Sequence, residues 1–257
     1  CLQEGFASKE ARKLLPETTL TQGFSDEAKV ERFTMIKHQH RMNAEISEFS
    51  RDQFYNGKAL IDANTIAERN QNYPFEYRKG RSRSVWLDVA SGINSGVNSK
   101  EIDAIKKILQ EFIEWARQNP PPKDNQNRDD KDRWEVALLS PYQAQRRGLR
   151  DMVRSLTGMQ YETRFDLMQM ADPSNVMLVV NSSDRFQGQE ADVVFLSLRN
   201  GSRIGFLDSP SRMNVAITRA RELRIIVGHH NYFSGDRCYD PMLKNLAKSH
   251  KGNSIER

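Results

Sequence analysis

Two arginines in the last quarter of the chain, Arg219 and Arg221, have the type and setting that phosphate chemistry uses. They end the run 214–221, which follows Pro210, a residue that favours the start of a helix. A guanidinium fixed in a cleft stabilises charge on a transferred phosphoryl group and binds phosphate through a planar fork. Asn214, Thr218 and Arg221 are expected about one turn apart along this helix, with Arg219 on another face. Taken alone, the run is more typical of a basic surface helix.

A second group of polar residues lies upstream, in the segment 182–190. Ser182 follows an apolar run, and Gln187-Gly188 predicts a turn whose backbone N–H groups can approach an anion. Glu190 carries a carboxylate that can accept hydrogen bonds from a ribose hydroxyl. A Phe-Gln-Gly triplet is weak support by itself. The order strand, loop, strand and arginine-bearing helix is a much stronger indication.

Two further segments could contribute to the same chemistry. Ser140 and Tyr142 stand at the end of a predicted strand, where a hydroxyl and an aromatic ring suit a nucleic-acid backbone or base. A simple strand-to-helix turn, with Pro141 near the helix start, explains them equally well. Arg41 follows a short apolar run at 33–37 and suits a cation that faces a cleft. In isolation, an arginine paired with a nearby carboxylate is the more frequent case.

The elements that would position these residues are predicted by apolar runs. Five runs read as strands, and the best of the intervening helices has apolar residues at three- and four-residue spacing from Ile102 to Ala116. Asn98 is expected to cap that helix, with Glu101 three positions on. Strands that are apolar on both faces and alternate with helices predict an α/β fold: a mostly parallel sheet with helices on both faces, and working residues at the carboxyl ends of strands. The predicted strands are 84–89, 136–139, 176–180, 193–198 and 223–227.

The domain organisation follows from changes in composition. Residues 1–33 are predicted to be an irregular lead-in from an inter-domain region, and 34–235 to form the main domain. The proline-rich and then charged stretch 118–133 is expected to be a mobile insertion. Residues 158–175 are predicted to be irregular, and 236–257 to form a C-terminal tail.

In this order, the four segments resemble the second motor domain of superfamily 1B helicases, in the group of the nonsense-mediated-decay helicase and senataxin. That family has QYRMHP…FY-G-L, then TPY..Q, S.D.FQG.E.D and RLNVALTRA. The matching stretches here are 39–44 with 54–60, 140–145, 182–192 and 212–220, and 204–208 also matches. The resemblance covers residues 34–232.

The resemblance implies roles for residues near a nucleotide. Arg41 and Arg219 resemble the two arginines that reach the γ-phosphate of ATP from across a cleft. Glu190 resembles the carboxylate that binds the ribose. Gln187 and Gly188 resemble the loop that links the nucleotide state to the motor.

The resemblance also implies a nucleic-acid track, and it has two departures. Ser140, Tyr142 and Ser182 lie in segments that face single-stranded DNA or RNA in this family. His40 stands where the family usually has a tyrosine that contacts the nucleoside. Asn43-Ala44 replaces the usual His-Pro. The affinity for the nucleotide, or the preference for one base, is therefore expected to differ from that of the family.

The parts of a nucleotide site that this chain lacks limit what it can do alone. The sequence contains no G-x-x-x-x-G-K-[ST], and no apolar strand ends in the Asp-Glu pair that holds Mg²⁺. The resemblance thus implies a RecA-like, P-loop NTPase fold without its own P-loop. ATP and Mg²⁺ would be bound mainly by an N-terminal RecA-like domain, expected before Cys1. This chain alone is expected to lack ATPase activity.

The expected function is the C-terminal motor half of an ATP-dependent DNA or RNA helicase that moves 5′ to 3′. Two alternatives remain open: a nucleic-acid-binding pseudo-helicase without turnover, and a free-standing nucleotide-binding α/β module. A broken P-loop upstream of Cys1 would favour the first alternative, and the absence of any upstream domain would favour the second.

Composition sets broad limits on this interpretation. The chain has 257 residues and a net charge of +5, which suits a phosphate-rich partner or ordinary solubility equally well. Two cysteines and five histidines without zinc spacing predict no disulfide framework and no metal site, and they favour an intracellular location, cytoplasmic or nuclear. No apolar run approaches the roughly 18–20 residues that a membrane span needs, so no membrane partner is expected. A first residue other than Met suggests a piece of a longer protein.

Overall fold

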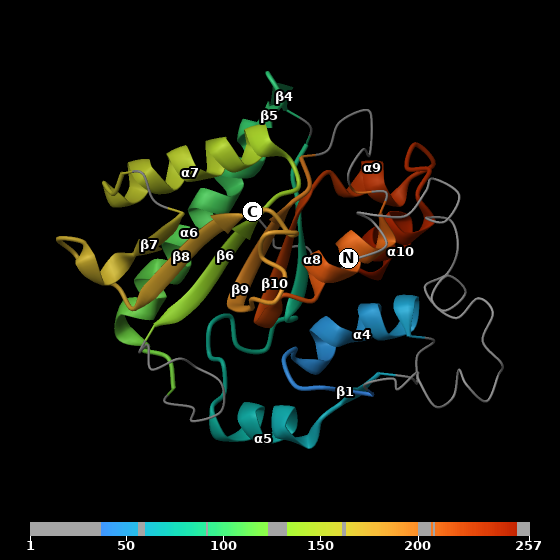
Figure 1. Ribbon diagram of the computed structural model, residues 1–257, viewed down its shortest axis with the longest axis horizontal. Helices are drawn as coiled ribbons and strands as arrows, with labels where there is room; N and C mark the ends of the chain where they lie inside the picture. The colour runs from blue at the N-terminus through green and yellow to red at the C-terminus, as the bar shows by residue number, and fades with distance from the viewer. Residues whose placement is uncertain are drawn as a thin grey trace, which may run out of the picture. The chain divides into compact units, whose positions relative to one another are not determined.

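A six-stranded sheet forms the centre of the computed structural model, which describes residues 37–55, 60–90, 92–122, 133–160, 163–199, 207 and 209–250 (Figure 1). The described residues from His38 onward belong to one compact unit. Five neighbouring strands are parallel, and the edge strand β7 is antiparallel. The predicted α/β class and mostly parallel sheet are confirmed. In spatial order the strands are β3 (Ser84–Asp88), β10 (Ala220–Gly228), β9 (Ala191–Ser197), β6 (Trp134–Leu139), β8 (Val176–Asn181) and β7 (Arg164–Asp166).

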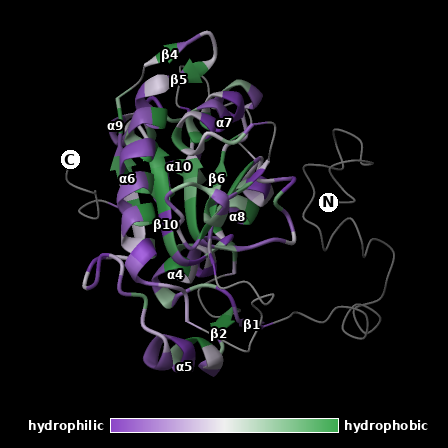
Figure 2. Ribbon diagram, turned by 90° about the vertical axis from the view of Figure 1, so that its left-hand side faces the viewer, coloured by the Kyte–Doolittle hydropathy of each residue, from purple (hydrophilic) through white to green (hydrophobic). Residues whose placement is uncertain are grey.

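Helices cover both faces of the sheet because the strands are apolar on both faces. All seven residues of β9 are buried. Along β6, Val136 and Leu138 pack into one apolar core, whereas Ala137 and Leu139 pack into the other, as strand alternation requires. Figure 2 shows the apolar strands lying between helices whose outer faces are hydrophilic.

The two faces of the sheet are covered by different sets of helices. One face is covered by α6 (Ser99–Gln118) and α7 (Gln143–Thr157). The other face is covered by α4 (Ala44–Phe54), α8 (Pro210–Ile217), α9 (His230–Ser234) and α10 (Pro241–Ser249). Figure 1 shows α6 and α7 on one side of the sheet and α4, α8 and α10 on the other.

Small elements complete the described chain. A parallel pair is formed by β1 (His38–Gln39) and β2 (Ile61–Asp62), and α5 (Asn64–Asn72) follows it. A short hairpin, β4 (Ile93–Asn94) and β5 (Val97–Asn98), immediately precedes α6. A 3₁₀ turn, η2 (Leu167–Gln169), follows β7.

Several sequence-based boundaries are corrected by the structure. The expected tail from residue 236 contains α10, whose Leu243 and Leu246 are fully buried, so the packed domain extends at least to His250. The stretch 158–175, expected to be irregular, contains β7 and η2, because Phe165 and Leu167 are buried in the core of α6 and α7. Residues 1–36 and 123–132, which hold the lead-in and most of the insertion, lie outside the described residues.

Two local expectations were wrong in detail. Asn98 does stand at the N-cap of α6, but its side chain donates to the Glu101 carboxylate at 3.0 Å instead of capping the helix. The helix predicted to carry Thr218 to Arg221 ends at Ile217. Arg221 is in β10, because the hydrogen bond from the Ala191 amide to the Arg219 carbonyl, 3.0 Å long, starts the pairing with β9 there.

Buried hydrogen bonds of Arg224, Ser84 and His250 connect the helices of one layer to the strands. The Arg224 guanidinium is 1% exposed and donates to the Ser84 hydroxyl at 2.7 and 3.0 Å and to the carbonyls of Ile46 and Ile217 at 3.1 and 2.9 Å. Burial lowers the pKa of Arg224 to about 9. The Ser84 hydroxyl lies 2.6 Å from Nε2 of His250. These bonds join α4, α8 and α10 to the start of β3 and the middle of β10.

The tautomer of His250 follows from its partners. Nδ1 lies 2.7 Å from the Leu246 carbonyl, which can only accept, so Nδ1 carries the hydrogen. Nε2 therefore accepts a hydrogen bond from the Ser84 hydroxyl. Burial, and then the charge of Arg224, lower the pKa of His250 from 6.5 to about 4.

His250 should make folding stability depend on pH. The unfolded chain takes up the His250 proton near pH 6.5, whereas the folded chain resists it until about pH 4, so stability falls as pH drops through this window. The loss attributable to this group should reach about 3 kcal/mol. Denaturant unfolding between pH 7 and 4 would measure it, with a His250→Asn variant as control. Equal pH slopes for the two proteins would contradict the assignment.

Candidate functional site

An arginine-rich cluster gathers at the edge of the sheet where β9 and β10 begin. Arg41 lies just before α4, Glu190 just before β9, and Arg219 between α8 and β10. Backbone hydrogen bonds hold these segments together: the Ala191 amide donates to the Arg219 carbonyl, and the Asn43 amide donates to the Arg221 carbonyl at 2.8 Å. Residues from distant parts of the sequence therefore meet on a rigid edge.

Glu190 lies between two arginines. Arg41 Nε donates to one carboxylate oxygen, and Arg221 Nε donates to the other at 2.7 Å. Burial opposes ionisation of this carboxyl, but hydrogen bonds and charge from Arg41 and Arg221 outweigh it and hold its pKa below the usual range. Asp192 adds a more distant negative charge, 3.8 Å from Arg221. Glu190 is thus ionised and shared between the two guanidinium groups.

Arg219 is held by neutral oxygen atoms. Its Nε donates to the Val215 carbonyl at 2.8 Å and its Nη1 to the Gln189 carbonyl at 3.2 Å. The structure records no ion pair for Arg219 among the described residues. Burial, and then the positive charge of Arg41, lower its pKa to about 10, against the opposing effect of Glu190. Arg219 therefore stays cationic at neutral pH and has no ion-pair partner among the described residues, a state that favours an added anion.

The position of this cluster corrects one expectation. The working residues were expected at the carboxyl ends of strands, but Glu190 and Arg219 lie at the amino ends of β9 and β10. The physical reason is that α8 crosses back over a parallel sheet and ends where β10 begins. Gln187 and Gly188 occupy the turn that leads to the same edge, and Gly188 has a φ of +82°, which glycine adopts without strain.

The neighbours of Arg41 include one residue that the sequence did not indicate. Arg69, on α5, donates to the Arg41 carbonyl at 2.9 Å and pairs with Glu222 at 3.1 Å. No motif marks Arg69, because its partners are distant in sequence. His40 is exposed, and its Nδ1 lies 3.2 Å from the Thr65 hydroxyl at the start of the same helix.

Ser140, Tyr142 and Ser182 come together at the opposite edge, where β6 and β8 end. The Ser140 amide donates to the Asn181 carbonyl at 3.2 Å, so the two strand ends remain adjacent. Ser140 is fully buried, and its hydroxyl accepts from the Tyr142 amide at 3.4 Å. Ser182 is 9% exposed, and its hydroxyl accepts from the Arg185 amide at 3.3 Å. Both serines thus shape the turns that follow their strands.

Cations surround these strand ends. Arg146 donates to the carbonyls of Ser140 and Pro141 at 3.0 and 2.8 Å. Burial, and then the charges of Arg150 and Arg185, lower the pKa of Arg146, against the opposing effect of Asp184, so three arginines and one carboxylate lie close together. The structure records no ion pair for these three arginines among the described residues. A cavity of about 110 Å³ opens here and is lined by Pro141, Arg146, Ser182, Ser183, Asp184 and Arg212, among others.

The arginines of this group were missed by the sequence analysis. Arg146 and Arg150 are four residues apart on α7, so helical periodicity alone places them on one face. Arg185 joins them through the turn after β8, which only the fold brings near.

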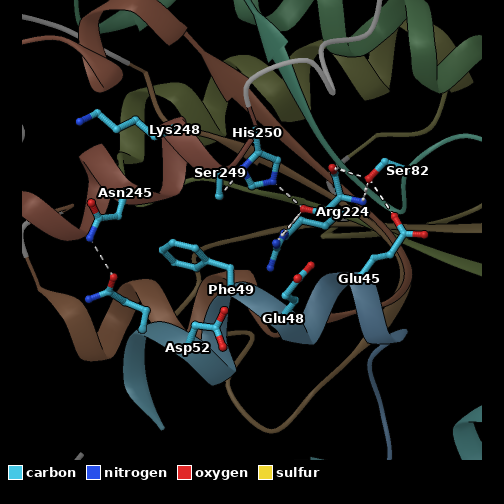
Figure 3. A pocket seen from close by; sticks show the side chains of 12 residues that line it. Glu45, Glu48, Phe49, Asp52, Ser82, Arg224, Asn245, Lys248, Ser249 and His250 are labelled. Atoms are coloured by element: carbon cyan, nitrogen blue, oxygen red, sulfur yellow. Dashed lines mark hydrogen bonds between the residues drawn. The ribbon is translucent and has the colours of Figure 1, made fainter. Parts of the chain in front are cut away.

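A larger cavity, of about 520 Å³, lies between α4 and α10 and shares no lining residue with either group. Figure 3 shows Glu45, Glu48 and Phe49 of α4 on one side and Lys248 of α10 on the other, with Arg224 and His250 also lining it. Its wall carries the three carboxylates of Glu45, Glu48 and Asp52 and the two cationic side chains of Arg224 and Lys248.

Metal binding does not fit the described residues. No group of three or more His, Cys, Asp and Glu side chains among them could hold a metal ion. The carboxylate of the arginine cluster, Glu190, already accepts from two arginines, and a divalent cation would be repelled by them. No helix within the described ranges is long and apolar enough to cross a membrane.

Comparison with known proteins gives consistent matches over most of the chain. A family model described as an AAA domain matches residues 17–231. The chain is 29% identical over 223 residues to the probable helicase MAGATAMA 3 of Arabidopsis thaliana. It is 27% identical over 225 residues to the regulator of nonsense transcripts 1 homolog of Drosophila melanogaster, and 27% identical over 222 residues to the helicase sen1 of Schizosaccharomyces pombe.

The relatives are much longer than this chain. The three alignments cover 84%, 84% and 81% of the chain but only 24%, 17% and 11% of the respective relatives. The chain therefore corresponds to one part of each of these proteins.

Removing the Glu190 charge should weaken the fold at this edge. In a Glu190→Gln variant, Arg41 and Arg221 lose the carboxylate they share and repel each other and Arg219. We expect the free energy of unfolding to fall by about 1–3 kcal/mol at low salt, with a smaller loss at high salt. Denaturant unfolding at pH 7 would measure it. Glu48→Gln, at an exposed carboxylate with no recorded ion pair, is the control, and equal effects of the two substitutions would contradict the prediction.

Proposed function

The chain belongs to the AAA domain family, in the superfamily 1 helicase group of the nonsense-mediated-decay helicase and senataxin, and we propose that it is the second motor domain of an ATP-dependent helicase. The observation that carries the proposal is the convergence of Arg41 and Arg219 on one edge, with Glu190 as the nearest carboxylate and no ion pair for Arg219 among the described residues. This arrangement leaves an excess of positive charge where an anion can approach.

In this proposal, ATP lies between the arginine cluster and a preceding RecA-like domain that contributes the P-loop and most of the Mg²⁺ site. Arg219 and Arg41 contact the γ-phosphate and stabilise the charge that develops on its oxygens, an effect worth about 10³–10⁵ in rate. Arg221 remains paired with Glu190 and keeps that carboxylate oriented. Oε1 of Glu190 accepts from both Nε and Nη2 of Arg221, whereas Oε2 accepts from Arg41. Oε2 therefore keeps a lone pair with which the carboxylate can accept from a ribose hydroxyl. His40, at the exposed position beside Arg41, faces the nucleoside.

Single-stranded DNA or RNA is proposed to lie along the opposite edge, where Ser140, Tyr142 and Ser182 are. Arg146, Arg150 and Arg185 provide cations there that have no ion-pair partner among the described residues, and a phosphate backbone would relieve their mutual repulsion. Backbone contacts of this kind hold either polymer, since only a 2′-hydroxyl contact separates RNA from DNA.

The segment 182–190 provides a physical connection between the two sites. It leaves β8 at the edge with the arginines of α7 and reaches β9 at the edge with the arginine cluster. Gln187 and Gly188 lie in this crossing. We propose that a shift at the nucleotide moves this segment and, with it, the strand contacts, which gives 5′-to-3′ stepping in the intact intracellular protein. This domain alone lacks turnover because it holds neither the P-loop nor the Mg²⁺ ligands.

ATP hydrolysis by the intact protein tests the nucleotide site. Wild-type turnover should rise when single-stranded DNA or RNA is added, and the preferred polymer identifies the substrate. Arg219→Ala should lower kcat by about 10³-fold or more, because the developing phosphoryl charge loses its guanidinium, and Arg41→Ala should also lower it strongly. Steady-state kinetics with saturating strand would measure both.

Arg237→Ala serves as the control, since Arg237 is exposed and has no recorded partner among the described residues. Normal kcat in Arg219→Ala would refute its assigned role. A wild-type protein that binds strand without turnover would instead identify a pseudo-helicase.

The salt dependence of strand binding tests the second edge. For single strands, removal of one phosphate-binding cation should reduce the slope of log K against log salt by about 0.7. Arg146→Ala and Arg150→Ala should each lower affinity and reduce this slope, whereas Arg81→Ala, an exposed arginine near the start of β3, should not. Fluorescence anisotropy with labelled oligonucleotides at several salt concentrations would measure the slopes. Unchanged slopes for both variants would place the strand elsewhere.

A further inference from the structure

An arginine covers one face of the Tyr142 ring at the end of β6. The guanidinium carbon of Arg199 lies over this ring, 3.8 Å from the centroid. An arginine at this distance stacks on the ring through cation–π attraction and planar contact. A base cannot stack on the ring face of Tyr142 that Arg199 already covers.

Arg199 is held in place from several sides. Its amide donates to the buried Glu101 carboxylate at 3.0 Å, and its Nη1 donates to the Gly96 carbonyl in the β4–β5 hairpin at 3.0 Å. Its φ is +42°, a left-handed conformation that costs free energy in any residue except glycine. Such strain persists only where the surroundings fix the backbone, and it is typical of ligand-binding positions.

The surroundings that fix Arg199 form a buried polar network. Glu101 also accepts from the Ser197 hydroxyl at 2.6 Å and from the Asn98 side chain at 3.0 Å. Gln145 donates to the Ser197 hydroxyl at 3.0 Å and accepts from the Asn98 amide at 2.8 Å. Glu101, Asn98, Gln145 and Ser197 are all fully buried. The network therefore joins the starts of α6 and α7 to the end of β9, directly beside Arg199.

The charge of Arg199 has no counter-ion in the described parts of the chain. The structure records no ion pair for it there, and its Nε is buried without a hydrogen-bond partner. Nη1 is bonded to Gly96, and no hydrogen bond from Nη2 to the described residues is recorded. The Tyr142 ring contacts the face of the Arg199 guanidinium. The Nη2 hydrogens at its edge can therefore donate to an acceptor on a bound ligand.

We propose that Arg199 contacts a phosphate of the bound single strand through Nη2 and that Tyr142 is a positioning residue that holds the guanidinium by stacking, instead of stacking on a base. This inference rests on the proposed function, and it deepens it by naming a strand contact outside the segments that the family resemblance assigned to the strand. Arg199 would act at the same edge of the sheet as Arg146, because the parallel neighbours β6 and β9 both end there.

The test compares strand binding by variants of the intact protein, with an oligo-dT and an oligo-U probe at several salt concentrations. Arg199→Ala should weaken binding about tenfold and reduce the salt slope by about 0.7, the value of one phosphate contact. Tyr142→Leu should weaken binding to a similar degree and should have little further effect in an Arg199→Ala background. Tyr142→Phe keeps the ring and should bind like the wild type, and Arg81→Ala is the arginine control.

The alternative of direct base stacking by Tyr142 predicts a different pattern. In that case Tyr142→Leu weakens binding equally in the wild-type and Arg199→Ala backgrounds and leaves the salt slope unchanged, which overturns the inference. An Arg199→Ala variant with wild-type affinity and slope also overturns it. Thermal unfolding of each variant separates weaker strand binding from a weaker fold, and the Tyr142→Phe and Arg199→Lys variants extend the test if a truncation unfolds. Arg199→Lys should keep most of the salt slope and lose affinity.

Failure of this inference differs from failure of the proposed function. If the wild-type protein hydrolyses ATP and binds single strands while Arg199→Ala behaves normally, only the role of Arg199 is refuted. If the wild type neither binds strands nor hydrolyses ATP, both proposals are refuted.

Discussion

The parallel hydrogen bonding of β10, β9, β6 and β8 is the constraint on which the rest of the structure depends. Parallel strands start at one edge of a sheet and end at the other, so each connection has to cross a face. The helix α8 and the segment 182–190 make two of these crossings. As a result, residues that follow β8 closely in sequence divide between two distant edges, Ser182 at one and Glu190 at the other.

The two edges hold their arginines by different means. At the starts of β9 and β10, Glu190 pairs with Arg41 and Arg221, while Arg219 is bound by carbonyl groups. At the ends of β6, β8 and β9, Arg146 is bound by carbonyl groups and Arg199 by an aromatic ring. Carbonyls and rings fix a guanidinium without neutralising it. Both edges thus hold positive charges in fixed positions. Binding of an anion is favoured there, because the arginine side chains lose little conformational entropy when the anion binds.

The buried Arg224 connects the two helices that flank the arginine cluster. Arg224 donates to Ile46 on α4 and to Ile217 at the end of α8, the two helices that lie next to Arg41 and Arg219. Arg224 therefore joins α4 to the end of α8 beside the two proposed phosphate contacts, and within the described residues its guanidinium donates to neutral oxygens.

The sequence determined the α/β class, the five parallel strands and the long helices, because apolar periodicity records burial directly. It also indicated Arg41, Glu190 and Arg219 as candidate site residues, because they stand in motifs with fixed local spacing. It could not assign Arg69, Arg185 or Arg199, since each acts with partners that no local pattern connects to it. Nor could it place Arg221 on β10 or pack α10 into the core. Those facts depend on strand register and on packing between distant segments, which only the tertiary structure decides, because contact energies at long sequence separation leave no periodic trace in the chain.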